Sequence, residues 1–232
     1  MTPAVPGRPY DATRPHEVRL RRRHRKARPG RTPSGRATLR IVTPEAASDV
    51  TAEPAILDAA QLASDPELRA RFAESAHRIL AELVSGGAAL GWVEPPSPDD
   101  VAELIDHVVS AAQAGDAALR AAYLDRRLVA LGYWRRYARP THWPHADLER
   151  VAVDAAMHGH GIGRSLTAAL VEDARAAGIE VLTLDARGDN ANALRLYRSL
   201  GFTEYGRLPG FVAFAGRRYD KVFYMLDLRQ EA

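Results

Sequence analysis

The chain has 232 residues, no cysteine and a formal net charge of +3. This length suits one large domain, or a smaller domain with an appendage, and either can bury a sizeable core. The lack of cysteine excludes disulfides, thiolate metal sites and an acyl-cysteine intermediate. No apolar run approaches the ~20 residues of a membrane span, and no secretory signal is visible. We therefore expect a cytoplasmic protein with no membrane contact.

The charge is divided unevenly along the chain. Residues 1–40 hold twelve Arg or Lys against two acids, a net +10, whereas residues 41–232 hold twenty against twenty-seven, a net −7. The first 36 residues are rich in Pro, Gly and Arg and nearly free of apolar side chains, so we predict a disordered arm over 1–36 and one domain over 37–232. Such an arm can bind nucleic acid electrostatically, or it can be a solvated tail or sequence upstream of the true start.

The first part of the domain is predicted to be mainly helical. A short strand is expected over Thr38–Val42, and two helical segments over Thr51–Ser85. Pro54 fits the first turn of one, and Asp65-Pro66-Glu67 supplies the cap and acidic first turn of the other. Within it, His77 is expected to be a partly exposed helix residue and no ligand.

A proline-rich break and a hairpin follow. Ala88–Val93 reads as a short strand or an extended connection. Ser97 and Asp100 form a capping pair for a helix that ends near Gly115. Strands over Ala118–Leu124 and Leu128–Tyr137, joined by a turn at Asp125-Arg126, then make a hairpin that leads to the central strand.

The most informative stretch is LERVAVDAAMHGHGIGRSL, from Leu148 to Leu166. It reads as a strand, then a glycine loop, then a helix that runs to about Ala177. Glycines let the loop bend closely, and the free amides of the helix N-terminus favour an anion such as a pyrophosphate. The letters fit neither the dinucleotide fingerprint nor the P-loop. The alternative is a tight turn that binds no ligand.

Two motifs in this half of the chain resemble the GNAT superfamily of acyl-CoA-dependent N-acetyltransferases. His158-Gly159-His160-Gly161-Ile162-Gly163 is similar to the family's motif Gln/Arg-x-x-Gly-x-Gly/Ala, with His158 replacing the usual first residue. After a buried strand over Glu180–Asp185, the segment from Asn190 to Phe202 matches Asn-x-x-Ala-x-x-Leu-Tyr-x-x-x-Gly-Phe at every fixed position. Strands over Glu204–Leu208 and Tyr219–Leu228, joined by a loop with Gly210 and Gly216, complete the expected elements.

The resemblance covers roughly residues 38–230 and implies an α/β fold of the α+β type. This GNAT fold has a mixed, mostly antiparallel sheet, splayed at the cofactor cleft and flanked by helices. The cofactor it implies is acetyl-CoA, and the activity is direct acetyl transfer to a primary amine. No metal is implied, because His142, His145 and His158 fit no zinc spacing.

The resemblance also assigns roles to residues of this chain. Tyr197 is implied as the hydrogen-bond donor to the leaving sulfur. Independently of the resemblance, the position of Glu149 on the central strand makes it a candidate relay for the amine proton or, equally, a paired structural carboxylate. The implied cofactor-binding residues lie on the central strand, in the glycine loop and in the second motif: Val151, Ala152, Val153, His158, Gly159, His160, Gly161, Ile162, Gly163, Arg164, Ser165, Asn190 and Ala193.

The acceptor is less well defined by the sequence. Helices between residues 54 and 114, with loops near Trp143 and from Gly210 to Asp220, are expected to wall the amine pocket. Tyr219 and Asp220 offer an aromatic face and a carboxylate to a cationic amine, or are simply hairpin surface. We expect a small-molecule amine. The alternatives are a protein N-terminal or lysine acetyltransferase, and a nucleic-acid-binding protein with a degenerate acetyltransferase domain; a homodimer is left open.

Overall fold

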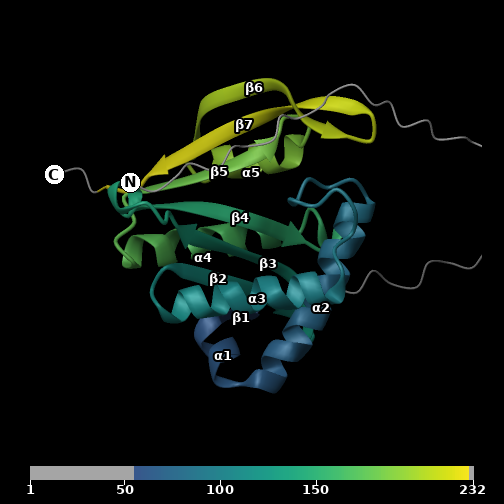
Figure 1. The fold of residues 1–232 in the computed structure, drawn as a ribbon, viewed down its shortest axis with the longest axis vertical. Coiled ribbons are helices and arrows are strands. Elements are labelled where there is room, and N and C mark those ends of the chain that lie inside the picture. Colours follow the sequence, from purple (N-terminus) through teal and green to yellow (C-terminus); the bar gives the residue numbers. More distant parts are fainter. Residues whose placement is uncertain (1–54, 230–232) are drawn as a thin grey trace, which may run out of the picture. The chain divides into compact units, whose positions relative to one another are not determined.

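The computed structural model describes residues 55–229. Figure 1 shows how its strands and helices are arranged. The strands are β1 Ala55–Asp58, β2 Ala117–Leu124, β3 Arg127–Arg136, β4 His145–Val153, β5 Val181–Arg187, β6 Thr203–Phe214 and β7 Arg217–Asp227. The helices are α1 Ala59–Ser64, α2 Pro66–Ser85, α3 Pro98–Gln113, α4 Ile162–Ala176 and α5 Ala191–Ser199. None of these helices is both long and apolar enough to cross a membrane.

The strands form one mixed sheet in the order β1-β2-β3-β4-β5-β7-β6. Every neighbouring pair is antiparallel except β4 and β5, which are parallel and are joined through α4. The sheet therefore has the mixed, mostly antiparallel topology that the sequence resemblance implied. Its one parallel pair lies next to the glycine loop.

Two apolar clusters cover the two faces of the sheet. Side chains of α4 and α5 pack with β3, β4, β5 and β7, whereas those of α1, α2 and α3 pack with β2 and β3. Strand β3 serves both clusters, because Leu131 and Tyr133 face one side and Ala130 and Trp134 face the other. The helices of the N-terminal half thus cover the β2–β3 end of one face and leave the β5–β7–β6 part of that face outside their cluster.

Local signals in the sequence explain where the helices begin. Asp65 accepts a hydrogen bond from the amide of Leu68 at 2.9 Å, and Pro66 occupies the first turn of α2. Ser97 and Asp100 form the reciprocal capping box of α3. The Asp125-Arg126 turn is also confirmed, with φ of 49° and 64° at these two residues, as a tight antiparallel hairpin requires.

Two expected elements differ from the structure, which also decides between the two alternatives for a third. The helix placed at Pro54 begins instead at Ala59, because Ala55–Asp58 pairs with β2 as an edge strand and Asp58 caps the helix. Ala88–Val93 contains no strand, which leaves the connection as the alternative that holds. The expected loop at Gly210 lies inside β6, which continues to Phe214 with a register shift between Leu208 and Val212. The strand expected over Thr38–Val42 and the boundary at residue 36 lie outside the described residues.

Candidate active site

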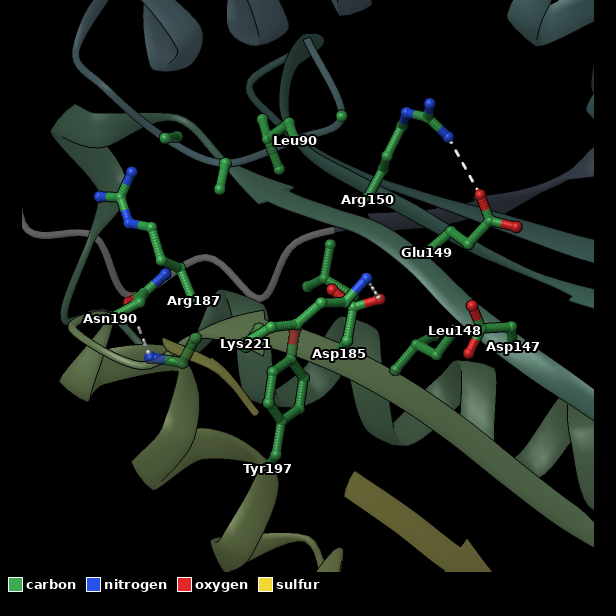
Figure 2. Close-up of a pocket in the computed structure, with 16 residues that line it drawn as sticks. Leu90, Asp147, Leu148, Glu149, Arg150, Asp185, Arg187, Asn190, Tyr197 and Lys221 are labelled. Carbon is green, nitrogen blue, oxygen red and sulfur yellow. Dashed lines mark hydrogen bonds and ion pairs between the residues drawn. The ribbon is translucent and has the colours of Figure 1, made fainter. Parts of the chain in front are cut away.

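The site is centred on the point where β4 and β5 separate. They pair only through His145↔Val181, Ala146↔Leu182 and Asp147↔Thr183, so within residues 55–229 β4 has no partner on this side beyond Asp147. A cavity of about 320 Å³ occupies the opening, and Figure 2 shows its lining. Its walls come from the loop Ala88–Gly91, from β4, β5 and α5, and from one residue of β7, Lys221. The N-terminal half therefore contributes the loop Ala88–Gly91 to the pocket, whereas the helices that were expected to wall the pocket do not line it.

A bulge in β4 changes which side chains face the cavity. Tyr133 pairs with Glu149 and Leu131 with Ala152, so Arg150 and Val151 together lie opposite Gly132. Arg150 adopts a φ of +48°, a conformation that costs a non-glycine residue about 1–3 kcal/mol. Its guanidinium compensates by hydrogen bonding to Tyr133 and Glu149 and by stacking over the ring of Trp92 at 4.6 Å.

The glycine loop leaves a row of amides without partners. Gly159 and Gly161 have φ of 83° and 78°, and a side chain at either position would point into open space. Within residues 55–229, the amides of residues 159–163 make no hydrogen bond to the protein. These amides lie at the N-terminus of α4, where the helix dipole also favours negative charge. The loop therefore fits a phosphate or pyrophosphate.

The polar side chains of this loop are turned toward the protein. His158 Nε2 donates to the Val153 carbonyl at 3.0 Å, and His160 Nδ1 bonds the carbonyl of His158 at 3.0 Å. Arg164 reaches the last turn of α5, where it bonds the carbonyl and hydroxyl of Ser199. A bound anion would thus be held mainly by backbone, which agrees with the unusual residue at His158.

Helix α5 brings Asn190, Ala193 and Tyr197 to the cavity. Asn190 caps the helix, because its side-chain oxygen accepts the amide hydrogen of Ala193 at 3.1 Å. Tyr197 is 8% exposed and packs against Phe202 and Tyr224. Burial raises the pKa of Tyr197 to about 12, and the charge of Asp185 adds to the effect. The phenol therefore remains protonated and acts as a donor at neutral pH.

Both oxygens of Glu149 are already engaged. Oε1 accepts from Arg135 at 3.1 Å, and Oε2 accepts from the Tyr133 hydroxyl at 3.0 Å and from Arg150 at 3.1 Å. Burial raises the pKa of Tyr133 to about 12, so this hydroxyl also stays a donor. These contacts fit a paired structural carboxylate, which is one of the two roles that the sequence left open for Glu149. The proton-relay role of Glu149 stays a prediction.

Other ionisable groups of the cavity were missed by the sequence reading. Asp147 lies at the vertex of the opening, and its Oδ1 accepts from the Thr183 hydroxyl at 2.6 Å. Asp185 pairs with Lys221 at 3.0 Å. Alternation along β4 back from Glu149 was a signal that could have found Asp147, since residues two apart share a face. No local pattern links Asp185 to Lys221.

The three residues expected to contact the acceptor do not line this cavity. Trp143 follows a 3₁₀ turn at Pro140–His142, and Arg136 stacks over its ring at 4.8 Å. Tyr219 lies under the guanidinium of Arg187, and Asp220 binds the Gly210 amide at 3.0 Å and Arg207 at 3.2 Å. The last two contacts favour the hairpin-surface alternative.

Fold and site together define a class of protein: a mixed α/β sheet split around a cleft with an anion loop at a helix N-terminus. Residues 58–202 match the family model described as the Acetyltransferase (GNAT) family. Because this match covers more than half of the chain, the protein belongs to the GNAT acetyltransferase family.

Similarity to individual proteins is more limited. The L-methionine sulfoximine/L-methionine sulfone acetyltransferase of Salmonella typhimurium is 37% identical over 82 residues, which is 35% of this chain and 48% of that protein. The [ribosomal protein bS18]-alanine N-acetyltransferase of Escherichia coli is 41% identical over 83 residues, 36% of this chain and 56% of that one. The chain thus spans about half the length of the curated relatives it matches.

A solved structure shares the fold. The phosphinothricin acetyltransferase of Sinorhizobium meliloti, determined in complex with AcCoA, superposes with a TM-score of 0.60 and 20% identity. The match covers 76% of this chain and 89% of that one. At this identity the comparison supports the fold.

The ionisation of Asp147 predicts a pH-dependent gain in stability when it is replaced. Burial raises its pKa to about 6 against the hydrogen bond from Thr183, and the charges of Glu149 and Asp185 act in the same direction as burial. Below pH ~4 the carboxyl is neutral in the folded and unfolded states; between pH 4 and 6 the cost of ionising the folded state grows, and above pH ~6 it is constant. Asp147→Asn should therefore raise the free energy of unfolding at pH 8 by about 1–3 kcal/mol, allowing for its partial exposure.

Denaturant unfolding at pH 4, 6 and 8 measures this effect. The matched control is Asp106→Asn, which removes an exposed carboxylate that pairs with Arg69 at 3.4 Å and should change stability by less than about 0.5 kcal/mol. A stability at pH 8 that is lower in Asp147→Asn than in the wild type would contradict the prediction.

Proposed function

We propose that the protein transfers an acetyl group from acetyl-CoA directly to a primary amine, and that the amine is a small molecule. The observation that carries the proposal is a set of three features: unpartnered loop amides between the end of β4 and the start of α4, a buried tyrosine donor in the cavity wall, and a β4 edge that lacks a strand partner among the described residues. Thiol release from acetyl-CoA across a panel of amines and peptides tests it directly.

The residues present fit this cofactor. The amides of Gly159–Arg164 and the dipole of α4 suit its pyrophosphate, with Ser165 and the imidazoles of His158 and His160 close by on the loop. The backbone edge at Val151, Ala152 and Val153, which does not pair with β5, suits the amides of its pantetheine arm, beside Asn190 and Ala193. When bound, acetyl-CoA supplies an acetyl group activated as a thioester.

Tyr197 is proposed to stabilise the departing sulfur by a hydrogen bond. With its pKa near 12, complete proton transfer to a thiolate of pKa about 8.5 would be uphill by about 5 kcal/mol. A hydrogen bond that strengthens as charge develops on the sulfur needs no such transfer. Tyr197 therefore acts as a donor to the transition state and keeps its proton.

Two considerations concern the acceptor. The Salmonella relative carries a small-molecule substrate in its name, and the cavity here is walled by the loop Ala88–Gly91, which Arg187 ties down through the Gly87 carbonyl at 2.8 Å. The Escherichia coli relative is named for a protein N-terminus, which makes a protein N-terminal or lysine acetyltransferase the alternative. Unpartnered loop amides and a buried Tyr197 argue against a degenerate domain.

The loop predicts a sharp difference between two substitutions at Gly161. Both Gly161→Ala and Gly161→Glu pay the cost of a side chain at φ +78°, about 1 kcal/mol, and the Cβ atom that both add meets no protein atom within 4 Å. Only glutamate adds charge and bulk at the anion site. Acetyl-CoA should raise the melting temperature of wild type and Gly161→Ala but not of Gly161→Glu. Equal stabilisation of all three would remove the loop from the cofactor site.

Removal of the Tyr197 hydroxyl should affect turnover more than binding. Tyr197→Phe is expected to lower kcat about 10- to 100-fold while changing acetyl-CoA affinity less than about twofold, because the contact strengthens only in the transition state. Tyr224→Phe is the control: it deletes a buried neighbouring hydroxyl that bonds Arg198 at 3.0 Å and does not line the cavity. A kcat that is reduced equally in both variants would point to a packing effect.

Weak nucleic-acid contact through the basic arm is proposed as a second property, supported by the net +10 of residues 1–40. Deleting residues 1–36 should abolish binding to DNA or RNA at low salt while leaving turnover of a small amine nearly unchanged. Loss of acetyl transfer with cofactor affinity retained would instead make the arm a recruiter of a polyanionic acceptor. A homodimer and a cytoplasmic location also remain predictions.

A further inference from the structure

The charges that line the cavity are compensated at every position but one. Arg150 pairs with Glu149 at 3.1 Å, Arg187 with Asp189 at 2.6 Å, and Lys221 with Asp185 at 3.0 Å. Asp147 has no ion pair among residues 55–229. Arg135 is its cross-strand neighbour, but that guanidinium binds Glu149. The cavity therefore presents one carboxylate that lacks a cation.

A chain of hydroxyls fixes the orientation of this carboxylate. Thr183 donates to Asp147 Oδ1 at 2.6 Å, and the Tyr137 hydroxyl lies 2.7 Å from Thr183 Oγ1. Because the single hydroxyl hydrogen of Thr183 is used on Asp147, Tyr137 donates to Thr183. Oδ1 is held in this way, and Oδ2 has no protein donor among the described residues. Figure 2 shows Asp147 on β4 with Glu149 and Arg150 further along the same strand.

Exposed aromatic side chains continue from the rim of the cavity onto the β6–β7 hairpin. Tyr205 is 56% and Phe211 60% exposed, and the Tyr205 ring lies 5.9 Å from that of Phe223. Lys221, which lines the cavity, has its ammonium 5.9 Å from the Phe211 ring and 5.4 Å from the Phe223 ring. We call Tyr205, Phe211 and Phe223 the aromatic strip. Exposed apolar surface of this kind beside a site marks a place for a ligand.

We propose that the acceptor is a primary amine with an aromatic or apolar body, that Asp147 binds its ammonium group and takes its proton, and that the aromatic strip holds its body. This inference rests on the proposed acetyl transfer and names the substrate class and the proton acceptor. The lone carboxylate supplies the charge complement of an ammonium ion. Glu149, with both oxygens engaged, is then a positioning residue that anchors Arg150.

The protons balance in this scheme. One N–H proton passes from the ammonium to Asp147 Oδ2, which makes the nitrogen lone pair available. The C–N bond then forms and the C–S bond breaks. A second N–H proton leaves the nitrogen and ends on the departing sulfur, to which Tyr197 donates a hydrogen bond. Asp147 returns its proton to solvent through the open cavity, so each turnover releases one proton.

The groups around Asp147 determine when it can accept a proton. Glu149 on β4, Arg135 on β3, Asp185 on β5, Lys221 on β7, Tyr205 on β6 and Tyr137 after β3 are the ionisable residues near it. Burial, with the charges of Glu149 and Asp185, raises the pKa of Asp147 to about 6. The carboxylate is therefore ionised, and able to accept, above pH ~6. We expect kcat/KM to rise through this pH.

The first experiment compares pH profiles of thiol release with 2-phenylethylamine as acceptor. Asp147→Asn should lower kcat/KM at pH 7.5 about 100-fold or more and abolish the rise of kcat/KM near pH 6, which we call the limb. The increase in melting temperature that acetyl-CoA causes should be unchanged. Glu149→Gln should keep the limb near pH 6, and Asp106→Asn should match the wild type. Because Asp147→Asn is expected to be at least as stable as the wild type, lost activity would not reflect misfolding.

The outcomes distinguish a failure of the Asp147 assignment from a failure of the proposed acetyl transfer. If acetyl-CoA stabilises the protein and thiol is released, but Asp147→Asn retains both rate and limb, the proton-acceptor assignment is wrong. If Glu149→Gln alone loses the limb, the relay belongs to Glu149. If no amine or peptide releases thiol and acetyl-CoA does not stabilise the protein, the proposed function itself fails.

The second experiment tests the aromatic strip by comparing acceptors that differ in their bodies. Wild type should prefer 2-phenylethylamine to ethylamine in kcat/KM by about tenfold or more, as expected for burying an aromatic group. Phe211→Ala should reduce that preference severalfold. An unaltered preference in Phe211→Ala and in Tyr205→Ala would overturn the role of the strip.

Discussion

The early end of the β4–β5 pairing is the constraint on which the site depends. Three residue pairs join these strands, the last at Asp147↔Thr183, and from there they diverge. The unpaired edge of β4 would be costly in a closed sheet, because buried backbone groups need partners. In an open cleft the same edge is available to a ligand with amides of its own. The cavity, the anion loop and Tyr197 are all placed relative to this opening.

The two faces of the sheet contribute different parts of the site. Helices α4 and α5 pack on one face and present the loop amides, Asn190 and Tyr197. The opposite face carries the α1–α3 cluster at its β2–β3 end, and the loop Ala88–Gly91 extends from that cluster to the cavity. The bulge in β4 opposite Gly132 shifts the alternation of side chains by one residue, so that side chains beyond it change from one face of the sheet to the other.

The carboxylates of the cavity have different roles because their partners differ. Glu149 is held by two guanidiniums and a phenol, and Asp185 is neutralised by Lys221. Asp147 has a hydroxyl partner but no ion pair in the described part of the chain, which leaves a charge that destabilises the folded state above pH ~6. Together with the positive φ of Arg150, this is local destabilisation of the kind that folded proteins tolerate at functional sites.

The sequence by itself determined the elements that depend on neighbours close in the chain. The caps at Asp65 and Ser97, the Asp125-Arg126 turn, the glycine loop and the α5 motif all act within a few residues, so their patterns predicted correct positions. Family, fold and the presence of Tyr197 and Asn190 at the cavity followed from the same stretches.

Tertiary structure decided what depends on partners far apart in the chain. Strand β1 exists because β2, about sixty residues later, supplies its hydrogen bonds, and β6 continues through Gly210 because β7 pairs along it. Asp147, Asp185 and Lys221 come from three strands, so no spacing in the sequence shows which charge is left unpaired. For the same reason Trp143 was expected at the pocket but lies outside its lining: its residue type and its place in a loop suggested a role, and only the folded arrangement defines which side chains meet.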